Sequence, residues 1–324
     1  MKLKTTFVRY VSLKEKKKSS IRKGGSISAF LGPYAICFLV FNIFPLILGL
    51  IMAFSGFDGK TMMPSSFVGW KNFQAVFTNP VLSRDFWSSV WTTIRFCLII
   101  VPLSIVIPIF LAILVNVKPF GYKFFRACIY LPTIFPITAT GLIILRMFDY
   151  QYGFINPFFN INVDWFGEVV TCWIIVGVFC LWAGVGGNFL IIDAGLENVD
   201  KSLYEASSVD GCNFWGKFIH VTLPGIKNQL FLCLFSTFIG YMNLYGQLYI
   251  LASNTPDQDA MKSAVYRIQD LLTGSSKSYG FAAAMGICLG VIIIFISIIQ
   301  LLCSKEKKGG GKREKEFTNW KKSK

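Results

Sequence analysis

The chain has 324 residues, 54% of them hydrophobic, and a mean hydropathy of +0.55, which is too apolar for an ordinary soluble domain. Most of the formal net charge of +15 lies in two end segments. Residues 1–28 hold nine Lys or Arg against one Glu, and residues 305–324 hold nine against three. A nucleic-acid-binding protein would carry this charge on a folded surface, so we expect an integral membrane protein with no nucleic-acid partner.

Apolar runs without charge, long enough to cross a bilayer, occur six times. About 20 apolar residues cross the hydrocarbon core, and a spanning segment satisfies its backbone polar groups as a helix. The first run is too long for the hydrophobic part of a signal peptide. The sequence therefore predicts an all-α membrane fold with six transmembrane helices, at 28–57, 96–117, 127–145, 169–192, 228–256 and 278–304.

The segments outside these runs predict the topology. Lysine and arginine collect on the cytoplasmic side of membrane proteins, so residues 1–27 and 305–324 are interpreted as cytoplasmic basic tails. The basic loop at 118–126 then lies inside and the acidic loop at 146–168 outside. Residues 58–87, rich in aromatic side chains, are predicted to form an external interfacial segment. We expect a multi-pass protein of the plasma membrane with both termini in the cytoplasm.

A polar stretch at 198–224 separates the fourth and fifth predicted spans on the cytoplasmic side. It contains Glu205-Ala206-Ser207, then Asp210-Gly211, then Leu223-Pro224. This order resembles the EAA loop of the permease subunits of ABC importers, a short helical segment that docks into a groove on the ATPase subunit.

Further landmarks extend the resemblance over residues 88–304, the MetI-like permease domain. They are Phe124-Phe125-Arg126, Leu131-Pro132, and Gly280 to Ala284 at the start of the last span. With the preceding helix they are similar to the six-span permeases of the maltose and glycerol-phosphate type of ABC type I importer. Asn254-Thr255-Pro256 departs from the family's Gly-Gly-Pro after the fifth span, at the outer gate.

The loop itself predicts two short helices. Ser202 and Glu205 fit a capping box for a helix over 203–210, and Gly211 is placed to end it in a left-handed turn. Leu203, Ala206 and Ser207 are expected on one face. A second helix follows at 214–221, and Pro224 is predicted to start the fifth span. The resemblance implies that the ATPase is contacted through Leu203, Tyr204, Glu205, Ala206, Ser207, Asp210, Gly211, Leu223 and Pro224.

Polar side chains within spans are costly in lipid and usually face the interior. The fifth span supplies Tyr241, Asn243, Tyr245 and Gln247, with each amide or ring pair four residues apart and so on a shared helical face. Rings that stack on sugars, beside amides that bind hydroxyls, would suit a carbohydrate path. Hydrogen bonding between helices is the alternative. Trp182 and Asn188 are weaker candidates.

No motif for catalysis or cofactor binding is present. The sequence lacks a phosphate-binding loop, and its nine cysteines and single His220 form neither a zinc motif nor a disulfide framework. We expect no catalytic residue, no metal and no cofactor. The resemblance implies a heterodimer with a second permease, two cytoplasmic ABC ATPases, an extracellular solute-binding protein and a sugar or oligosaccharide as solute, in contact with membrane lipid. A secondary transporter or a membrane-embedded enzyme are the alternatives.

Overall fold

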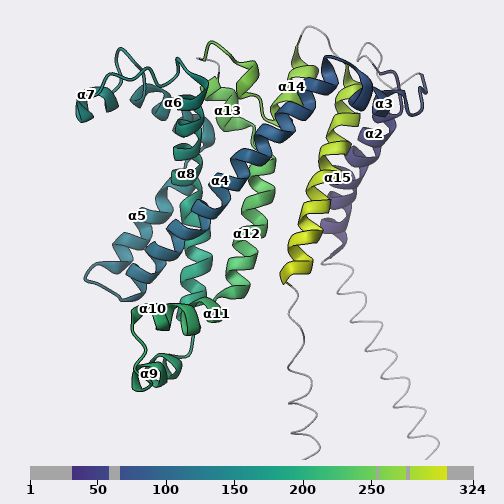
Figure 1. Ribbon diagram of the computed structural model, residues 1–324. Helices are drawn as coiled ribbons and strands as arrows, with labels where there is room; N and C mark the ends of the chain where they lie inside the picture. The colour runs from purple at the N-terminus through teal and green to yellow at the C-terminus, as the bar shows by residue number, and fades with distance from the viewer. Residues whose placement is uncertain (1–30, 58–65, 253–254, 275–277, 305–324) are drawn as a thin grey trace, which may run out of the picture.

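The computed structural model describes residues 31–57, 66–252, 255–274 and 278–304. Within these ranges the chain is helical, with one isolated bridge between Ser55 and Phe67 and no β-strand. The two predicted basic tails lie outside the described residues. The long helices run side by side, and short helices lie at both ends of the bundle (Figure 1).

Among the described residues, four helices are long and apolar enough to cross a membrane, and two bent helix pairs pass the same test together. The single helices are Leu31–Ala53, which contains η1 (Leu39–Ile43) and α2 (Phe44–Ala53), α4 (Leu82–Asn116), α8 (Val169–Glu197) and α15 (Tyr279–Ser304). The predicted number of six spans is reached when each bent pair counts as one span.

The span predicted at 127–145 as one helix is instead two helices. α5 (Tyr122–Ile134) and α6 (Ile137–Met147) meet at 97°. Phe135 has extended backbone angles before Pro136. A proline clashes with the residue before it in the α conformation, so the helix ends there. Hydropathy alone does not register this bend.

The predicted span 228–256 is also interrupted. α12 (Lys227–Met242) ends at Asn243, and a separate helix, α13 (Gly246–Leu251), follows after Tyr245, whose backbone is not helical. The helical spacing used to assign faces to Asn243, Tyr245 and Gln247 therefore does not apply. α13 packs instead against α6, where Gly141 leaves room for Ile250.

The second span starts well before the predicted residue 96. The side chain of Asn79 accepts hydrogen bonds from the backbone N–H groups of Val81 and Leu82 and so starts α4 at Leu82. Pro102 and Pro108 lie inside this 35-residue helix. Part of the predicted external segment 58–87 is thus the first turn of a transmembrane helix, and another part is the short α3 (Lys71–Thr78).

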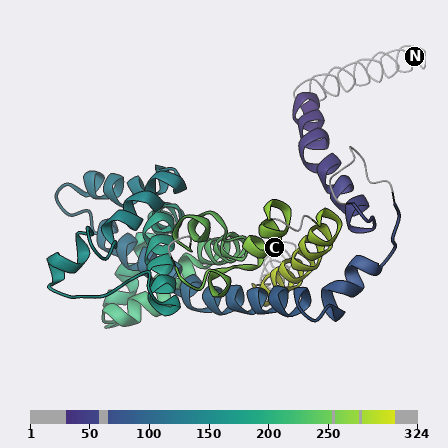
Figure 2. The ribbon, with the colours of Figure 1, turned by 90° about the horizontal axis from the view of Figure 1, so that it is seen from above.

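The first helix is joined to the rest of the chain mainly at its C-terminal end. The Asn72 side chain donates hydrogen bonds to the carbonyls of Ala53 (2.9 Å), the last residue of α2, and of Ser55 (2.8 Å), just beyond it. At Gly280 an added Cβ would lie 2.3 Å from the Ser55 carbonyl oxygen, so α15 approaches this point closely because residue 280 is glycine. α2 packs along α15, and the first helix extends away from the other spans (Figure 2).

The remaining short helices lie at the two ends of the helix bundle. α7 (Ile155–Phe159), η4 (Asp259–Met261) and α14 (Ala264–Thr273) lie at one end with α13, while α9 (Lys201–Val209), α10 (Phe214–Lys217), η2 (Phe218–Thr222) and α11 (Leu223–Gly225) lie at the other. The buried core follows α4 and α8, the most extensively paired helices of the bundle.

Candidate functional site

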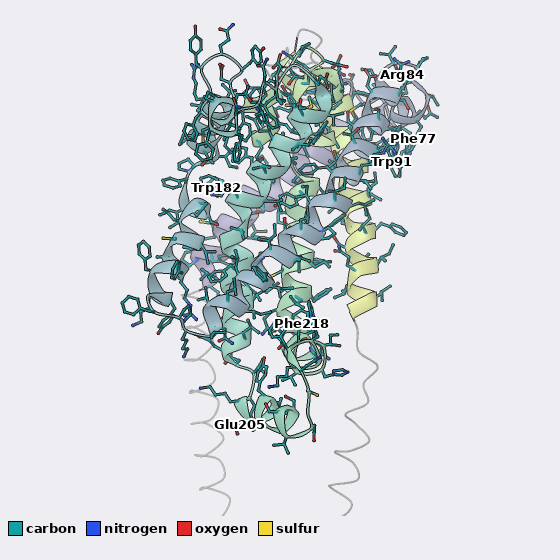
Figure 3. The ribbon with its side chains drawn as sticks, turned by 60° about the vertical axis from the view of Figure 1, so that its left-hand side comes forward. Phe77, Arg84, Trp91, Trp182, Glu205 and Phe218 are labelled. Atoms are coloured by element: carbon teal, nitrogen blue, oxygen red, sulfur yellow. The ribbon has the colours of Figure 1, made fainter. Side chains whose placement is uncertain are left out.

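The polar stretch predicted to contact an ATPase projects beyond the ends of the long helices. α9 is the outermost element at this end of the molecule (Figure 1), and Glu205 lies at its far side, with Phe218 between it and the bundle (Figure 3). The predicted cap is wrong: Asp200, not Ser202, is the N-cap, and its carboxylate accepts a 2.9 Å hydrogen bond from the Ser202 N–H. This bond lowers the pKa of Asp200.

α9 is held to the chain that follows it by two side-chain contacts. The hydroxyls of Tyr204 and Thr222 lie 3.0 Å apart, and the Lys217 ammonium donates a 2.7 Å hydrogen bond to the hydroxyl of Ser208. Both contacts link α9 to the helical segment that leads into α12. α9 is therefore attached to the segment before a membrane-spanning helix by side chains as well as by the backbone.

The outward face of α9 differs from the predicted one. Ser207 is buried, and its hydroxyl donates to the Tyr204 carbonyl at 2.8 Å. Leu203 is half exposed, Ala206 is exposed, and Val209 is 89% exposed. These three, spaced by three residues, form an outward apolar stripe beside the exposed Glu205. Val209 was missed from the sequence, although its spacing from Leu203 and Ala206 could have identified it.

The turn after α9 has the predicted left-handed conformation at Gly211. Gly211 has φ +76°, the left-handed region that glycine adopts without strain, and its N–H donates to the Ser208 carbonyl. Asn213 caps the next helix through the Gly216 N–H. Pro224 does not start the fifth span: the helical segment continues to Gly225, and a 70° bend at Ile226 precedes α12. Leu223 is half-buried and Pro224 exposed.

An ion cluster joins α5 to α8 near the same end. Arg126 lies 2.8 Å from Asp193, whose side chain is 4% exposed, and also pairs with Glu197. The other carboxylate oxygen of Asp193 is buried without a hydrogen-bond partner among the described residues. The predicted fourth span ends at residue 192, whereas α8 continues to Glu197 and so includes Asp193, the buried partner of Arg126.

The four predicted solute-path residues line one cavity of about 590 Å³. It is bounded by α8, by the end of α12, by the break before α13 and by the start of α6. Its polar or small lining residues are Gly184, Gly187, Asn188, Thr237, Gly240, Tyr241, Asn243, Tyr245, Gly246 and Gln247. No carboxylate, lysine, arginine or histidine contributes to this lining. The predicted residues line the same cavity because the chain is interrupted between α12 and α13. They do not lie on one face of a continuous helix.

The polar side chains of the cavity differ in how they are used. The Tyr241 hydroxyl lies 3.0 Å from that of Ser104 and donates to the Cys180 carbonyl, and the Asn188 amide donates to the Ser104 carbonyl and the Thr237 hydroxyl. These two residues therefore tie α4, α8 and α12 together. Asn243 donates to the Ile239 carbonyl and keeps its amide oxygen free of other described residues.

The Gln247 side chain makes no hydrogen bond to another described residue, so its amide is available to a solute. The rings of Tyr245, Tyr249 and Tyr266 lie with centroids 5.5 to 6.0 Å apart. Trp182, the other weaker candidate, is 44% exposed and is not part of the cavity wall.

Residues 104–308 match the family of binding-protein-dependent transport system inner membrane components. The chain belongs to this family. It is the permease, a transport subunit of an ABC transporter that spans the membrane several times, and the projecting α9 is the position of its EAA-like segment.

Curated relatives match this permease over most of their length. The arabinooligosaccharides transport system permease protein AraP of Bacillus subtilis is 30% identical, over 87% of this chain and 89% of the relative. The sulfoquinovosyl glycerol permease SmoG of Agrobacterium fabrum is 27% identical over 83% and 89%. The lactose permease LacF of Rhizobium radiobacter is 24% identical over 90% and 98%.

Solved structures share the fold. A chain of a bacterial ABC transporter that imports the acidic polysaccharide alginate superposes with a TM-score of 0.72 at 21% identity, covering 88% of this permease and 97% of that chain. A second structure, of the alginate transporter in complex with an alginate pentasaccharide-bound periplasmic protein, gives 0.73 at 20% identity, with 87% and 94% covered. The all-helical MetI-like fold expected from the sequence is thereby confirmed.

Proposed function

We propose that this permease translocates an uncharged sugar or oligosaccharide through the cavity around Asn243 and Gln247. The observation that carries the solute class is the lining of that cavity, where amides and tyrosine rings occur without a carboxylate, lysine, arginine or histidine among the described residues. Amides bind hydroxyls, and a charged solute would leave its charge unpaired in such a site. Relatives named for arabinooligosaccharides and lactose support the same class.

Transport is driven by two ABC ATPases that bind the outward stripe of α9. Leu203, Ala206 and Val209 present an apolar surface outside the membrane, and Glu205 beside them presents one negative charge to a basic groove. Motion of the ATPases moves α9, and the Tyr204–Thr222 contact passes the motion to α12 and to the cavity wall. A second permease closes the other side of the cavity, and an extracellular binding protein delivers the solute at the α13–α14 end.

This arrangement requires α9 and both termini in the cytoplasm. Single cysteines at Val209 and at Asn160, in a cysteine-free background, provide the test with an impermeant thiol reagent. Labelling at Asn160 in intact cells and at Val209 only after permeabilisation is expected. The reverse pattern would overturn the orientation.

Coupling is tested in the assembled transporter with Glu205→Lys, against Glu168→Lys as a control for the same charge change on the opposite side. We expect Glu205→Lys to abolish solute-stimulated ATP hydrolysis and uptake while the protein remains inserted. Full uptake by the Glu205 variant would argue against α9 as the docking element. Absence of an ATPase and a second permease among proteins co-purified with the wild type would favour a secondary transporter.

A further inference from the structure

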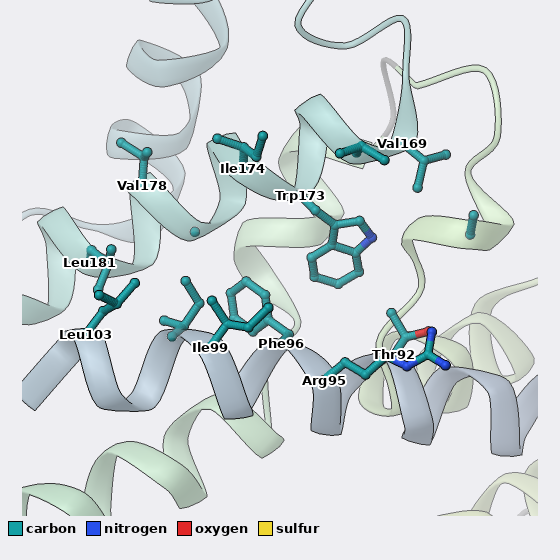
Figure 4. A pocket seen from close by; sticks show the side chains of 14 residues that line it. Thr92, Arg95, Phe96, Ile99, Leu103, Val169, Trp173, Ile174, Val178 and Leu181 are labelled. Atoms are coloured by element: carbon teal, nitrogen blue, oxygen red, sulfur yellow. The ribbon is translucent and has the colours of Figure 1, made fainter.

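A second crevice, of about 620 Å³, opens between α4 and α8 on a different part of the bundle (Figure 4). Its wall is apolar over most of its length and includes Phe96, Ile99, Leu103, Ile174, Val178 and Leu181. The rings of Phe96 and Trp173, 5.2 Å apart, lie within it. Ile99 and Ile174 are more than half exposed. The crevice shares no lining residue with the proposed solute cavity.

One end of this crevice is cationic. The Arg95 side chain extends along α4 toward Thr92, at the end where α8 begins with Val169 (Figure 4). Its guanidinium lies 5.1 Å from the centroid of the Trp91 ring, and it forms no ion pair with another described residue. Ionisable groups in membrane-spanning segments usually pair with an opposite charge or extend to the interface, so Arg95 is available to bind an anion.

The same end continues into a polar pocket of about 300 Å³. Thr92 and Ala260 line both spaces, and the polar pocket adds Ser88, Asp85 and Asp257, together with the ion-paired Asp259, Lys262 and Arg267. Hydroxyl groups placed there would find carboxylate acceptors. The combined site is apolar at one end, cationic at the junction and rich in hydrogen-bond acceptors at the other.

The crevice is long enough to hold a large part of an acyl chain. At 1.5 Å per residue it extends about 16 Å along α4 from Thr92 to Leu103, and one leaflet of the hydrocarbon core is about 15 Å deep. α4 is inclined to the other long helices (Figure 1), so a chain in this crevice would lie obliquely to the bundle axis.

We infer that the crevice between α4 and α8 binds one anionic phospholipid with a polyol headgroup, of the phosphatidylglycerol class. Its phosphate pairs with Arg95, one acyl chain lies along Ile99, Leu103 and Ile174, and the headgroup hydroxyls donate to the carboxylates beyond Thr92. This lipid supplies both a charge for the guanidinium and an apolar tail for the groove, whereas an apolar transmembrane helix of a partner would supply only the apolar surface.

Photocrosslinking in intact membranes tests the occupant. p-Benzoylphenylalanine is placed at Ile174, inside the crevice, and at Leu98, an α4 residue that is 68% exposed and outside the crevice. We expect an adduct with the mass of one diacyl phospholipid at residue 174, enriched in phosphatidylglycerol over the bulk membrane, and the bulk lipid composition at residue 98. A cross-link from residue 174 to a polypeptide, or the bulk composition there, would overturn the inference.

The role of the charge is tested on the purified protein by native mass spectrometry with dioleoyl-phosphatidylglycerol and dioleoyl-phosphatidylcholine. The wild type should bind the anionic lipid about tenfold more tightly. Arg95→Gln should abolish this preference and Arg95→Lys should keep it. Ile174→Trp, which fills the groove, should weaken binding of both lipids, and Leu98→Trp should leave binding unchanged. Equal affinity of the wild type for the two lipids would contradict the assignment.

Discussion

The hydroxyl of Tyr204, in the helix that projects from the bundle, lies 3.0 Å from the hydroxyl of Thr222, in the segment that leads to the fifth span. It is the side-chain contact through which movement of α9 reaches α12 most directly. Removing it should weaken coupling more than it weakens folding.

Tyr204→Phe and Thr222→Val should each reduce solute-stimulated ATP hydrolysis and uptake, because each removes one partner of a hydrogen bond worth about 0.5–1.5 kcal/mol. The double variant should be no worse than the single ones, since both remove the same contact. Uptake and ATP hydrolysis of the wild type, the two single variants and the double variant are measured in proteoliposomes as a double-mutant cycle. Additive losses would indicate that the two hydroxyls act separately.

Substitution of Gly211 is expected to impair transport. Its φ of +76° places an L side chain in the left-handed region, so Gly211→Ala should cost roughly 1–2 kcal/mol locally and Gly211→Pro should prevent the turn. Uptake should fall in that order while membrane insertion persists. Gly290→Ala is the control: this helical glycine has no heavy atom within 4 Å of an added Cβ. Normal uptake by Gly211→Pro would exclude a requirement for the turn.

The Arg126 cluster should behave as a buried ion pair. Arg126→Met leaves the Asp193 carboxylate buried without its partner and should destabilise the protein by about 3–5 kcal/mol. Adding Asp193→Leu should recover most of this loss, because the unpaired charge is then removed. Thermal unfolding of the purified protein in detergent measures both. Equal instability of the single and double variants would contradict the pairing.

Gln247→Leu should lower uptake about tenfold or change the preference among sugars, since the amide lines the cavity without a described partner and is proposed to bind the solute. Its unfolding temperature should stay at the wild-type value. Gln151→Leu, on the exposed loop after α6, controls for loss of an amide elsewhere. A stability defect with unchanged sugar preference would instead assign Gln247 to helix packing.

The ion pairs of Asp259 should make stability depend on pH at the acidic end. Hydrogen bonds from Lys262 and Arg267 keep the pKa of Asp259 below its usual value. A lowered folded-state pKa means that the stabilisation is complete above the unfolded pKa of about 4 and is lost as pH falls through the folded value. Because Asp259 is 71% exposed, the effect should stay below about 1 kcal/mol.

Unfolding temperatures of the wild type and Asp259→Asn should therefore differ at pH 7 and converge once the pH is below the lowered pKa of Asp259. A difference that persists at low pH would show that the carboxylate charge is not the cause.

Hydropathy predicts which segments are apolar enough to span a membrane, but not where they bend. The bend at Phe135 and Pro136 and the break at Asn243 depend on backbone restrictions of single residues, which a sum over 20 residues averages out. For the same reason the four cavity residues were grouped by a helical spacing that does not exist, although they do line one cavity.

The N-cap and the outward face of α9 could not be predicted because neighbouring residues give competing local signals. Asp200 and Ser202 are both good N-cap residues, and the sequence offers no means of ranking two candidates two positions apart. Ser207 was assigned to the outward face from spacing alone, whereas its burial follows from how α9 is held by Tyr204 and Lys217. Contacts between distant segments, such as Arg126 with Asp193, have no local signature.

The contact between Gly280 and Ser55 can form only late in biosynthesis. The first helix leaves the ribosome early, yet the helix on which it packs, α15, is among the last parts of the chain to be made. At ordinary elongation rates the interval is on the order of ten seconds or more. During that time Asn72 can already bind the carbonyls at the end of α2, while the apolar side of the first helix is in contact with lipid or an insertion chaperone. A chain stalled before α15 would carry an unpaired helix that membrane quality control can recognise.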